Sequence, residues 1–356
     1  MEKPLTFILR KLFLYTLSFI LITAIIYGFI VVSTTPHSRA ELYLPFNTSR
    51  LTQRQIDVLL DRAIKDYHLD APYPVQYSIW LKNFLLGNWG YSPSLRASVK
   101  QIIINRLPPT IELTLYSILI FLPLGLLSGI IAAGRKHKIQ DIAIRFSASV
   151  ATSIPTLILA ILLIIIFSIN LHWFAPDRLS SSNLVLVNSP DFKLFTGLIT
   201  LDGLLNGRPD VSWDAFKHLV LPAITLALPQ WALLAKLTRT GLLDELNKDY
   251  ITMARGMGIS EWKLQLQYAL KNVTPIVLSN AMLSVAMLLT NTYIVETIFH
   301  YPGLSFIALK TIADGPDAPS LMGFAVVSIL LVLLLMFILD ILLFSYDRRI
   351  GVPEPE

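Results

Sequence analysis

A short polar stretch, residues 249–275, lies between two hydrophobic runs that are each long enough to cross a bilayer. Its first part carries side chains at the spacing i, i+3, i+4, i+7, which predicts one face of a short helix. These side chains are Tyr250, Met253, Ala254 and Met257. Gly256 and Gly258 are expected to weaken and then end this helix, because glycine favours the conformation found after a helix C-terminus. Such a compact element between two spans predicts a surface offered to a partner.

The second part of the polar stretch predicts another helix. Ser260 stands where an N-cap residue is favoured. Trp262, Leu266 and Leu270 then give an apolar stripe at helical spacing. Residues 249–275 are therefore predicted to form two helices joined at the glycines.

No motif for catalysis or cofactor binding occurs in the sequence. It has no G-x-x-x-x-G-K-[ST] loop for ATP phosphates, no H-E-x-x-H zinc motif and no G-x-S-x-G nucleophile elbow. Gly256 and Gly258 lack the third glycine and the preceding strand of a dinucleotide site. The six histidines are scattered and there is no cysteine. We therefore expect no catalytic residue, no metal site and no bound cofactor.

The composition is that of a membrane protein. Hydrophobic residues make up 54% of the chain and charged residues 15%, and the mean hydropathy is +0.61. A soluble domain carries about 25% charged residues. The net charge of +5 fits basic residues in cytoplasmic loops better than a nucleic-acid surface. Lipid is thus an expected partner, and nucleic acid is not.

Six segments are apolar over about 20 residues, the length that crosses a bilayer. They are Leu12–Ser38, Leu113–Gly134, Phe146–Leu171, Leu219–Ala235, Val273–Val295 and Ser320–Leu339. The fourth is the shortest and contains two prolines. The first is longer than the ~7–15-residue core of a signal peptide and has no small-x-small cleavage site after it, so it is predicted to be retained. These segments predict an all-α integral membrane protein with six transmembrane helices.

The distribution of Lys and Arg predicts the orientation, because short cytoplasmic loops are rich in these residues. If the N-terminus is cytoplasmic, the short outer loop His300–Pro319 has only one basic residue, Lys310. Most other outer basic residues fall in two long segments, Arg39–Arg106 and His172–Lys217, and long segments translocate largely regardless of charge. Both termini and residues 249–275 are therefore predicted to be cytoplasmic.

The two long outer segments are either linkers or functional loops. Within the first, Leu51–His68 predicts a helix and Asn83–Pro93 predicts turns at Gly87 and Gly90. The predicted helix has one apolar face, formed by Ile56, Leu59, Leu60 and Ile64. Aromatic residues around the turns predict packing, with the bilayer interface as one possible place; they are Trp80, Phe84, Trp89 and Tyr91.

Few ionisable residues lie in or near the spans. Glu112 and Glu296 are close to span ends and Asp340 is late in the last span. Near an interface, a cap or a structural hydrogen bond is favoured over a direct role in function. A proton-coupled carrier would need several such groups at mid-membrane. An intramembrane hydrolase would need a catalytic pair, and the sequence offers no evident partner for Asp340.

Four prolines lie inside or near the predicted spans: Pro123, Pro155, Pro222 and Pro229. Each is expected to kink its helix, because proline removes one backbone hydrogen bond and clashes with the preceding turn. Kinked helices could open and close a pathway. Proline is also tolerated in membrane helices, so plain packing irregularity is an equal alternative.

Several motifs occur in a fixed order along the chain. Residues 69–80 match L-x-x-P-x-P-x-Q-Y-x-x-W, and residues 87–92 match G-D-x-G-x-S with Asn88 for Asp. Residues 106–113 match R-L-P-x-T-x-E-L, residues 295–304 match V-E-x-x-F-x-x-P-G-L, and residues 347–350 are close to D-P-R-I. Between them lie Ser153–Pro155, His218–Pro222 and Asp249–Gly258. Over nearly its whole length the sequence resembles the inner-membrane permease subunits of dipeptide, oligopeptide and nickel importers of the ATP-binding-cassette (ABC) class. It departs from them in the polar stretch, where Thr252 and Met253 replace Glu and Ala and Met257 replaces a frequent Lys.

This resemblance implies a type I ABC importer permease fold with long periplasmic loops, in a bacterial inner membrane. The implied parts are a first transmembrane helix (1–38), a periplasmic segment (39–106), a permease core of five transmembrane helices (107–345) with a cytoplasmic coupling loop (248–275), and a cytoplasmic tail (346–356). The loop residues implied to dock on an ATPase are Asp249, Tyr250, Met253, Ala254, Arg255, Gly256, Met257, Gly258 and Glu261.

The resemblance also implies partners and a cargo. The partners are a second homologous permease, two cytoplasmic ATPases that bind the ATP, and a periplasmic solute-binding protein. The chain itself is then a non-catalytic subunit, and small peptides are the expected solute. A permease for nickel chelates or polyamines is an alternative, and so is a stand-alone channel or secondary carrier, although the spans lack the polar rings that a lone pathway needs.

The orientation can be tested with single cysteines, since the chain has none of its own. Cysteines at Ser49, Ser182 or Ser320 are expected to react with an impermeant thiol reagent added outside the cell, and one at Ser260 is not. Labelling of the Ser260 position from outside would reverse the predicted orientation.

Overall fold

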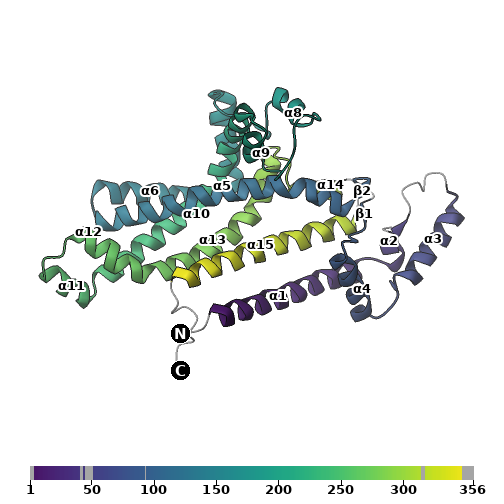
Figure 1. The fold of residues 1–356 in the computed structure, drawn as a ribbon, viewed down its shortest axis with the longest axis horizontal. Coiled ribbons are helices and arrows are strands. Elements are labelled where there is room, and N and C mark those ends of the chain that lie inside the picture. The colour runs from purple at the N-terminus through teal and green to yellow at the C-terminus, as the bar shows by residue number, and fades with distance from the viewer. Residues whose placement is uncertain (1–3, 41–42, 45–50, 93, 314–316, 347–356) are drawn as a thin grey trace. The chain divides into compact units, whose positions relative to one another are not determined.

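The computed structural model describes residues 4–40, 43–44, 51–92, 94–313 and 317–346. Helices build most of this part of the chain (Figure 1), so the predicted fold class is confirmed. The described residues contain one short antiparallel ladder, β1 (Tyr91–Ser92) with β2 (Ala97–Ser98). The predicted tail from residue 347, including its 347–350 motif, and Ser49 and Pro93 lie outside the described residues.

The chain forms two compact units. Unit 1 comprises Pro108–Gly303 together with Met1–Phe7 and Leu335–Glu356. Unit 2 comprises Ile8–Leu107 together with Leu304–Leu334. Residues from two distant parts of the sequence therefore build the second unit.

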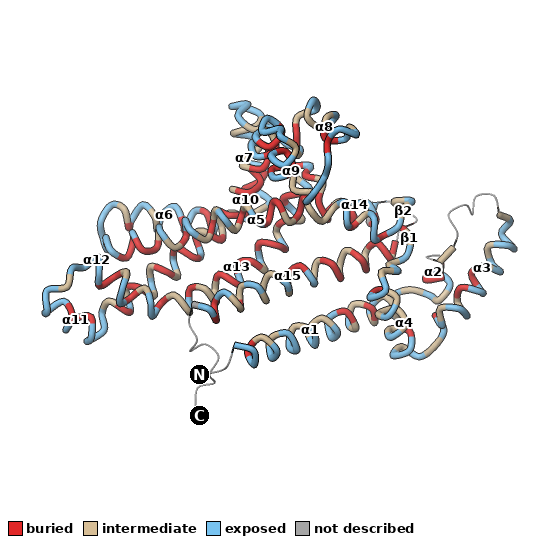
Figure 2. The backbone as a smooth tube through the Cα atoms, in the orientation of Figure 1, coloured by how far each residue is buried: buried red, intermediate tan, exposed pale blue. Residues whose placement is uncertain are grey.

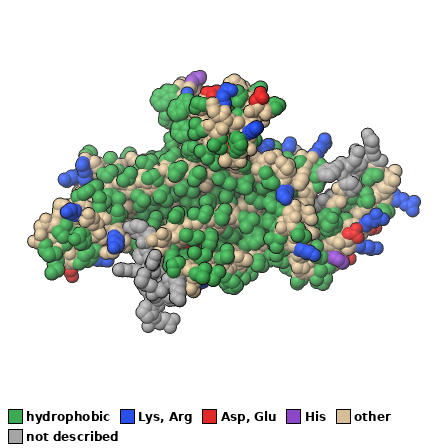
Figure 3. All heavy atoms as spheres, in the orientation of Figure 1, with side chains coloured by type: hydrophobic (Ala, Val, Ile, Leu, Met, Phe, Trp, Pro, Cys, Tyr) green, Lys and Arg blue, Asp and Glu red, His purple; other side chains and the backbone are tan. Residues whose placement is uncertain are grey.

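Five helical segments of the described chain are long and apolar enough to cross a membrane. They are α1 (Pro4–Ser33), α5 (Val99–Gly134), α10 (Pro209–Leu246), the continuous segment Glu261–Ile298, and α15 (Ala318–Tyr346). A bent pair of helices supplies a sixth if it is counted as one span. Figure 3 shows hydrophobic side chains over much of the visible face of the molecule, as a membrane protein requires.

The third predicted span, Phe146–Leu171, is wrong as a single helix. α6 (Ile139–Ser153) ends early, and α7 (Thr156–Leu163) then continues as the π-helix η3 (Ile164–Asn170), at 105° to α6. Pro155 explains the break, because the residue before a proline is pushed out of the helical conformation. Ile154 is accordingly extended, with φ −96° and ψ 121°.

The other three prolines lie inside unbroken helices. α5 runs through Pro123, and α10 runs through both Pro222 and Pro229. Membrane helices tolerate proline where neighbouring groups satisfy the freed backbone carbonyls. Among the four candidate prolines, only Pro155 ends a helix, and any opening of a pathway at the others stays a prediction.

α10 is the centre of unit 1. It packs along α13 (Leu270–Ile298), beside which it runs in Figure 1, and also against α6, α7 and α9 (Ile199–Leu205). In its most apolar 18-residue stretch 67% of the residues are buried, against 11% for α1. Figure 2 shows the buried positions concentrated on α10, α13 and the neighbouring part of α5. The core cluster of this unit includes Leu219, Leu226, Leu234, Val285 and Leu288.

The fourth predicted span, Leu219–Ala235, is the middle of this 38-residue helix. In the sequence it is the shortest of the six predicted spans and contains two prolines, and Lys217 and Lys236 flank its apolar run. The helix continues past both lysines, since Ala215 and Leu242 on either side are buried at 2% and 0% exposure. Packing therefore extends the helix beyond the charges that appeared to limit it.

The second long segment, His172–Lys217, is folded. It contains α8 (Ser181–Val187), α9 and the start of α10, and it has its own small core. Asp214 stabilises the start of α8, since its carboxylate accepts hydrogen bonds from Ser180 N at 2.9 Å and from the Asn183 amide at 2.9 Å. This segment is thus a small helical structure and not a linker.

Unit 2 contains most of α1, then α2 (Pro36–Ala40), α3 (Gln53–Asp66), α4 (Tyr73–Leu85), the β-ladder, α14 (Ser305–Ala313) and the start of α15. The predicted helix in 51–68 is confirmed as α3, which buries Leu60 and packs against α2. The predicted turns are confirmed at Gly87 and Gly90, with φ of +83° and +84°.

The predicted aromatic packing around these turns is confirmed. The ring of Phe84 stacks on Trp80, with 5.6 Å between centroids, and on Trp89, with 4.7 Å. Asp317 accepts a hydrogen bond from the Ser92 hydroxyl at 2.5 Å and from Ser320 N at 3.1 Å. The β-ladder is thereby fixed to the first turn of α15.

The structure also bears on the labelling positions for the topology experiment. Ser182 and Ser260 are exposed, so cysteines there are accessible to reagent. Ser320 is completely buried, so a cysteine at that position would not report the side of the membrane.

Close approach of α5 to α10 depends on two glycines four residues apart, Gly125 and Gly129. A Cβ added at Gly129 would lie 2.5 Å from Thr238 Cβ and 2.8 Å from the carbonyl oxygen of Ala235. Small residues at this spacing let membrane helices pack with their backbones close together.

We expect Gly129→Val to lower the free energy of unfolding by about 1–3 kcal/mol, the usual cost of overpacking a core. The thermal midpoint of the detergent-solubilised chain, followed by the loss of its monodisperse size-exclusion peak, measures this effect. Gly256→Ala is the control, because a Cβ at that helical position meets nothing within 4 Å. Equal midpoints for the two variants would contradict the close packing of α5 on α10.

Candidate partner-docking loop

The predicted short helix is α11 (Asp249–Gly256). Lys248 precedes it in an extended conformation, and Met257 follows its last residue. Gly258 then has φ +84°, which confirms that glycine ends this element in a left-handed conformation. Asp249 lies in the first turn and Arg255 in the last, the placement that the helix dipole favours.

α11 has two apolar faces. The inner face carries Ile251 and Ala254, which are 0% and 4% exposed and belong to the core of unit 1. The outer face carries Met253 and Met257, which are 70% and 69% exposed, and Tyr250 is 39% exposed. The predicted single face therefore divides, with Ala254 on the inside and the other three side chains outside.

The predicted second helix is not a separate element. α12 (Glu261–Lys263) passes into the π-helix η4 (Leu264–Ala269) and directly into α13. Ser260 has the extended N-cap conformation, with φ −65° and ψ 146°, but its hydroxyl makes no capping hydrogen bond. Trp262 is 62% exposed, whereas Leu266 and Leu270 are half-buried against the core. The predicted stripe thus also divides between surface and interior.

A buried carboxylate that the motif analysis missed holds α11 in place. Glu245, near the end of α10, accepts hydrogen bonds from the Tyr250 hydroxyl at 2.6 Å and from the Asn272 amide at 2.9 Å, and pairs with Lys248 at 2.7 Å. It thereby connects α10, α11 and α13. Lys248 follows Glu245 at the i, i+3 spacing of helical pairs, and this was the one signal available in the sequence.

A second connection fixes the start of the long helical segment. The Gln265 amide donates a hydrogen bond to the carbonyl oxygen of Ile130 in α5. The end of α5 leaves room for it, because a Cβ on Gly134 would lie 2.5 Å from the Gln265 side-chain oxygen. The loop is therefore attached to three of the long helices.

An exposed ion pair crosses the glycine turn. The Arg255 guanidinium donates to both oxygens of Glu261, at 2.5 and 3.1 Å. A surface pair of this kind adds little stability, but it limits how far the end of α11 can move from the start of α12. The predicted loop residues thus lie on α11, the glycine turn and the first residue of α12. Arg255, Gly256, Met257, Gly258 and Glu261 are all exposed.

The carboxylate of Glu112 is fully buried and neutralised within unit 1. One oxygen accepts hydrogen bonds from Thr200 N and its hydroxyl, at 2.9 and 2.8 Å. The other pairs with Arg178 at 2.5 Å and accepts from the Tyr301 hydroxyl at 3.1 Å. Burial raises the pKa of the Tyr301 phenol well above its ordinary value, so it remains a donor. The prediction of a structural hydrogen bond for Glu112 is confirmed.

Glu296 has the same structural role. Its carboxylate accepts a hydrogen bond from the Thr110 hydroxyl at 2.5 Å, and a Cβ on Gly303 would overlap it.

Other acidic side chains of unit 1 are also buried. Asp340 is 5% exposed and interacts with another residue. Elsewhere in unit 1, Asp141 pairs with Arg239 at 2.5 Å. Among the described residues, no three His, Asp or Glu side chains come together as a metal site.

Residues 125–352 match the family described as binding-protein-dependent transport system inner membrane component. The chain belongs to this family. It is therefore a multi-pass component of an inner-membrane transport system that depends on a binding protein, and it acts in transport and not as an enzyme.

Relatives match this transport component over almost their whole length. The oligopeptide transport system permease protein AppB of Bacillus subtilis is 30% identical over 93% of this chain and 95% of its own. The dipeptide transport system permease protein DppB of the same organism is 31% identical over 86% of this chain and 87% of its own. A solved structure of the MetNI methionine ABC transporter is also similar. The match covers 70% of this chain and 95% of the MetNI chain, with 16% identity and a TM-score of 0.46.

The loop generates a prediction for Gly258→Val. A Cβ at Gly258 meets nothing within 4 Å, so the substitution acts only by straining a backbone with φ +84°, which a β-branched residue adopts poorly. If the loop docks an ATPase, we expect the variant to insert into the membrane but to lose solute-stimulated ATP hydrolysis in the assembled transporter.

Gly207→Val is the matched control, since Gly207 also has a positive φ of +68° and open space around it but lies outside the loop. It should lose similar stability and keep coupled ATP hydrolysis. Gly258→Asn should recover part of the activity, because asparagine tolerates the left-handed conformation. Full solute-stimulated hydrolysis in assembled Gly258→Val would argue against the docking role.

Proposed function

We propose that this chain is the membrane-spanning permease of an ABC importer of small peptides. It pairs with a second homologous permease to form the translocation path. Two ATPase subunits bind ATP and dock on α11, and a periplasmic binding protein delivers the solute. The observation that carries this proposal is the near full-length similarity to permeases that are described as parts of oligopeptide and dipeptide transport systems.

The loop geometry supports the ATPase partner. Met253, Met257 and Trp262 are each more than 60% exposed, and they lie on a stretch between two spans that the charge pattern predicts to be cytoplasmic. Large apolar side chains gathered on a surface that does not face lipid indicate a protein contact. Because the chain has no nucleotide motif of its own, energy for transport has to come from such a partner.

The orientation is part of the proposal. With both termini and α11 in the cytoplasm, α3, α4, α8 and α9 lie on the periplasmic side, where a binding protein has access. Lys and Arg favour this arrangement in the short loops.

The interior charges support a path that does not itself select by charge. Glu112 is neutralised by Arg178, and Asp141 by Arg239, so these groups are not available to hold the termini of a peptide. The binding protein then has to recognise the peptide outside, and the permease lets it through. Substitution of polar residues in the spans should accordingly change the rate of uptake more than its selectivity.

We expect the complete assembly to take up di-, tri- and longer peptides in an ATP-dependent manner, with weak dependence on side chain. The measurement is uptake of a labelled peptide panel into proteoliposomes that contain both permeases and the ATPases, with the binding protein added. Nickel, a polyamine and a sugar serve as non-peptide solutes.

Uptake confined to a non-peptide solute would contradict the peptide cargo but would leave the assignment as an ABC importer permease intact. Transport by this chain alone, without ATPases, would instead support the stand-alone channel or carrier. The two results separate the choice of cargo from the choice of mechanism.

A further inference from the structure

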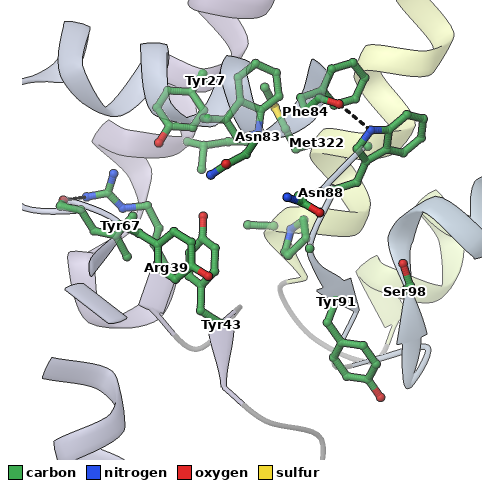
Figure 4. Close-up of a pocket in the computed structure, with 18 of the residues that line it drawn as sticks. Tyr27, Arg39, Tyr43, Tyr67, Asn83, Phe84, Asn88, Tyr91, Ser98 and Met322 are labelled. Carbon is green, nitrogen blue, oxygen red and sulfur yellow. Dashed lines mark hydrogen bonds between the residues drawn. The ribbon is translucent and has the colours of Figure 1, made fainter. Parts of the chain in front are cut away.

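Unit 2 contains a pocket of about 550 Å³. The end of α1, α4, the turns after α4 and the start of α15 line it (Figure 4). Aromatic side chains form much of the wall, among them Tyr27, Tyr43, Tyr67, Trp80 and Trp89. Its volume is within the range of small-molecule sites.

Arg39 brings a positive charge to this pocket. The side chain is 5% exposed, and it lies with Tyr43 and Tyr67 across the pocket from Asn88 (Figure 4). Its Nη1 donates to the Gln76 side-chain oxygen at 2.5 Å, and its Nη2 donates to the carbonyl oxygen of Leu69 at 3.1 Å. Its Nε is buried and has no hydrogen-bond partner.

Among the described residues, no opposite charge balances Arg39. Both of its acceptors are neutral, and none of the carboxylates that the structure describes forms an ion pair with it. A buried charge without a counter-charge is costly, and a buried donor without an acceptor adds to the cost. An anion in the pocket would lower this cost by supplying the acceptor that Arg39 Nε lacks among the described residues.

The lining restricts the kind of anion. Among the described lining residues there is no Asp or Glu, so the amino terminus of a zwitterionic peptide would find no carboxylate. Asn83 and Asn88 supply neutral amides. Burial raises the pKa of the Tyr43 phenol, so it remains an uncharged donor. An acidic head on an apolar body fits this set better than a free peptide.

The position of the pocket along two spans points to the source of that anion. Tyr27 and Ile30 lie near the end of α1, and Ala318 and Pro319 lie at the start of α15. Tyrosine and tryptophan concentrate at the level of lipid headgroups, where spans leave the hydrocarbon. At the same level α1 keeps apolar side chains exposed for acyl chains to cover; they are Ile25, Phe29 and Val32.

We propose that this pocket binds the headgroup of an anionic phospholipid, with its phosphate oxygens accepting hydrogen bonds from Arg39. The glycerol and the first part of the acyl chains contact the aromatic wall. The lipid supplies a counter-charge that the described residues do not offer to Arg39, and it joins α1, α4 and α15 within unit 2.

Native mass spectrometry of the purified, delipidated full chain tests this assignment, with dioleoyl phosphatidylglycerol as the probe. The wild-type chain should bind one phosphatidylglycerol molecule more tightly than any further lipid molecules. Arg39→Gln should weaken its binding by about tenfold or more, the loss expected for a hydrogen bond to a charged group. Arg62→Gln is the matched control, because it removes an exposed arginine from α3 in the same unit and should leave the affinity unchanged.

A second variant keeps the test valid if Arg39→Gln folds poorly. Asn88→Asp changes an exposed lining side chain to an isosteric anion and leaves the hydrogen bonds of Arg39 intact. The added negative charge should weaken phosphatidylglycerol binding, and the size-exclusion profile should stay unchanged. Dioleoylglycerol, which has no phosphate, should bind wild type and both variants equally weakly. An excess of the dipeptide Ala-Phe should not displace the lipid.

Equal phosphatidylglycerol affinity in wild type and Asn88→Asp would overturn the proposal. Displacement of the lipid by Ala-Phe would also overturn it and would assign the pocket to the solute. Both readouts measure binding to this chain alone, so they are independent of the cargo and of ATP-driven uptake.

Discussion

The cost of burying charge is the constraint on which the rest of this structure depends. A charged side chain inside a helical bundle is stable only if an opposite charge and hydrogen bonds surround it. Glu112 and Arg178 are 66 residues apart in sequence, and Asp141 and Arg239 are 98 residues apart. Each pair can form only if distant helices meet in one register. Removing one partner would leave the other charge buried, so these pairs specify the arrangement of unit 1 as well as stabilise it.

The sequence predicted the helices well because hydropathy reports burial in lipid directly. Four of its six spans lie wholly within unbroken helical segments, and the first, Leu12–Ser38, extends five residues past the end of α1 at Ser33. It misplaced helix ends where it used charge as the boundary, as at Lys217 and Lys236, since tertiary packing carries α10 beyond both. It also could not distinguish Pro155, which breaks a span, from Pro222, which does not. That difference depends on whether neighbouring helices support the chain on both sides of the proline, and a single sequence does not contain this information.

The sequence predicted the position of α11 but missed the residues that attach it to the core of unit 1. The helix, the glycine stop and the exposed methionines follow from spacing alone. Gln265 was missed because its partner Ile130 lies 135 residues away in the sequence, and Glu245 because a polar residue beside a polar stretch looks solvated. Ile251 was missed because the apolar spacing pointed to the opposite face of the helix. Apolar periodicity also could not say that α11 has two apolar faces. The period of a helix reveals a face, but only the fold decides which face meets the core and which meets a partner.

The two faces of α11 explain how a docking element could move a membrane domain. The inner face is part of the same core as α10 and α13, and Glu245 connects all three helices through hydrogen bonds below 3 Å. After the glycine turn the chain does not enter a flexible linker, because α12 and η4 continue directly into α13. A displacement of the exposed methionines would therefore be transmitted to two spans as a rigid-body movement. ATP can shift such a permease between states only through its different affinity for the two arrangements of the ATPases, and a stiff connection is what carries that difference in free energy into the membrane.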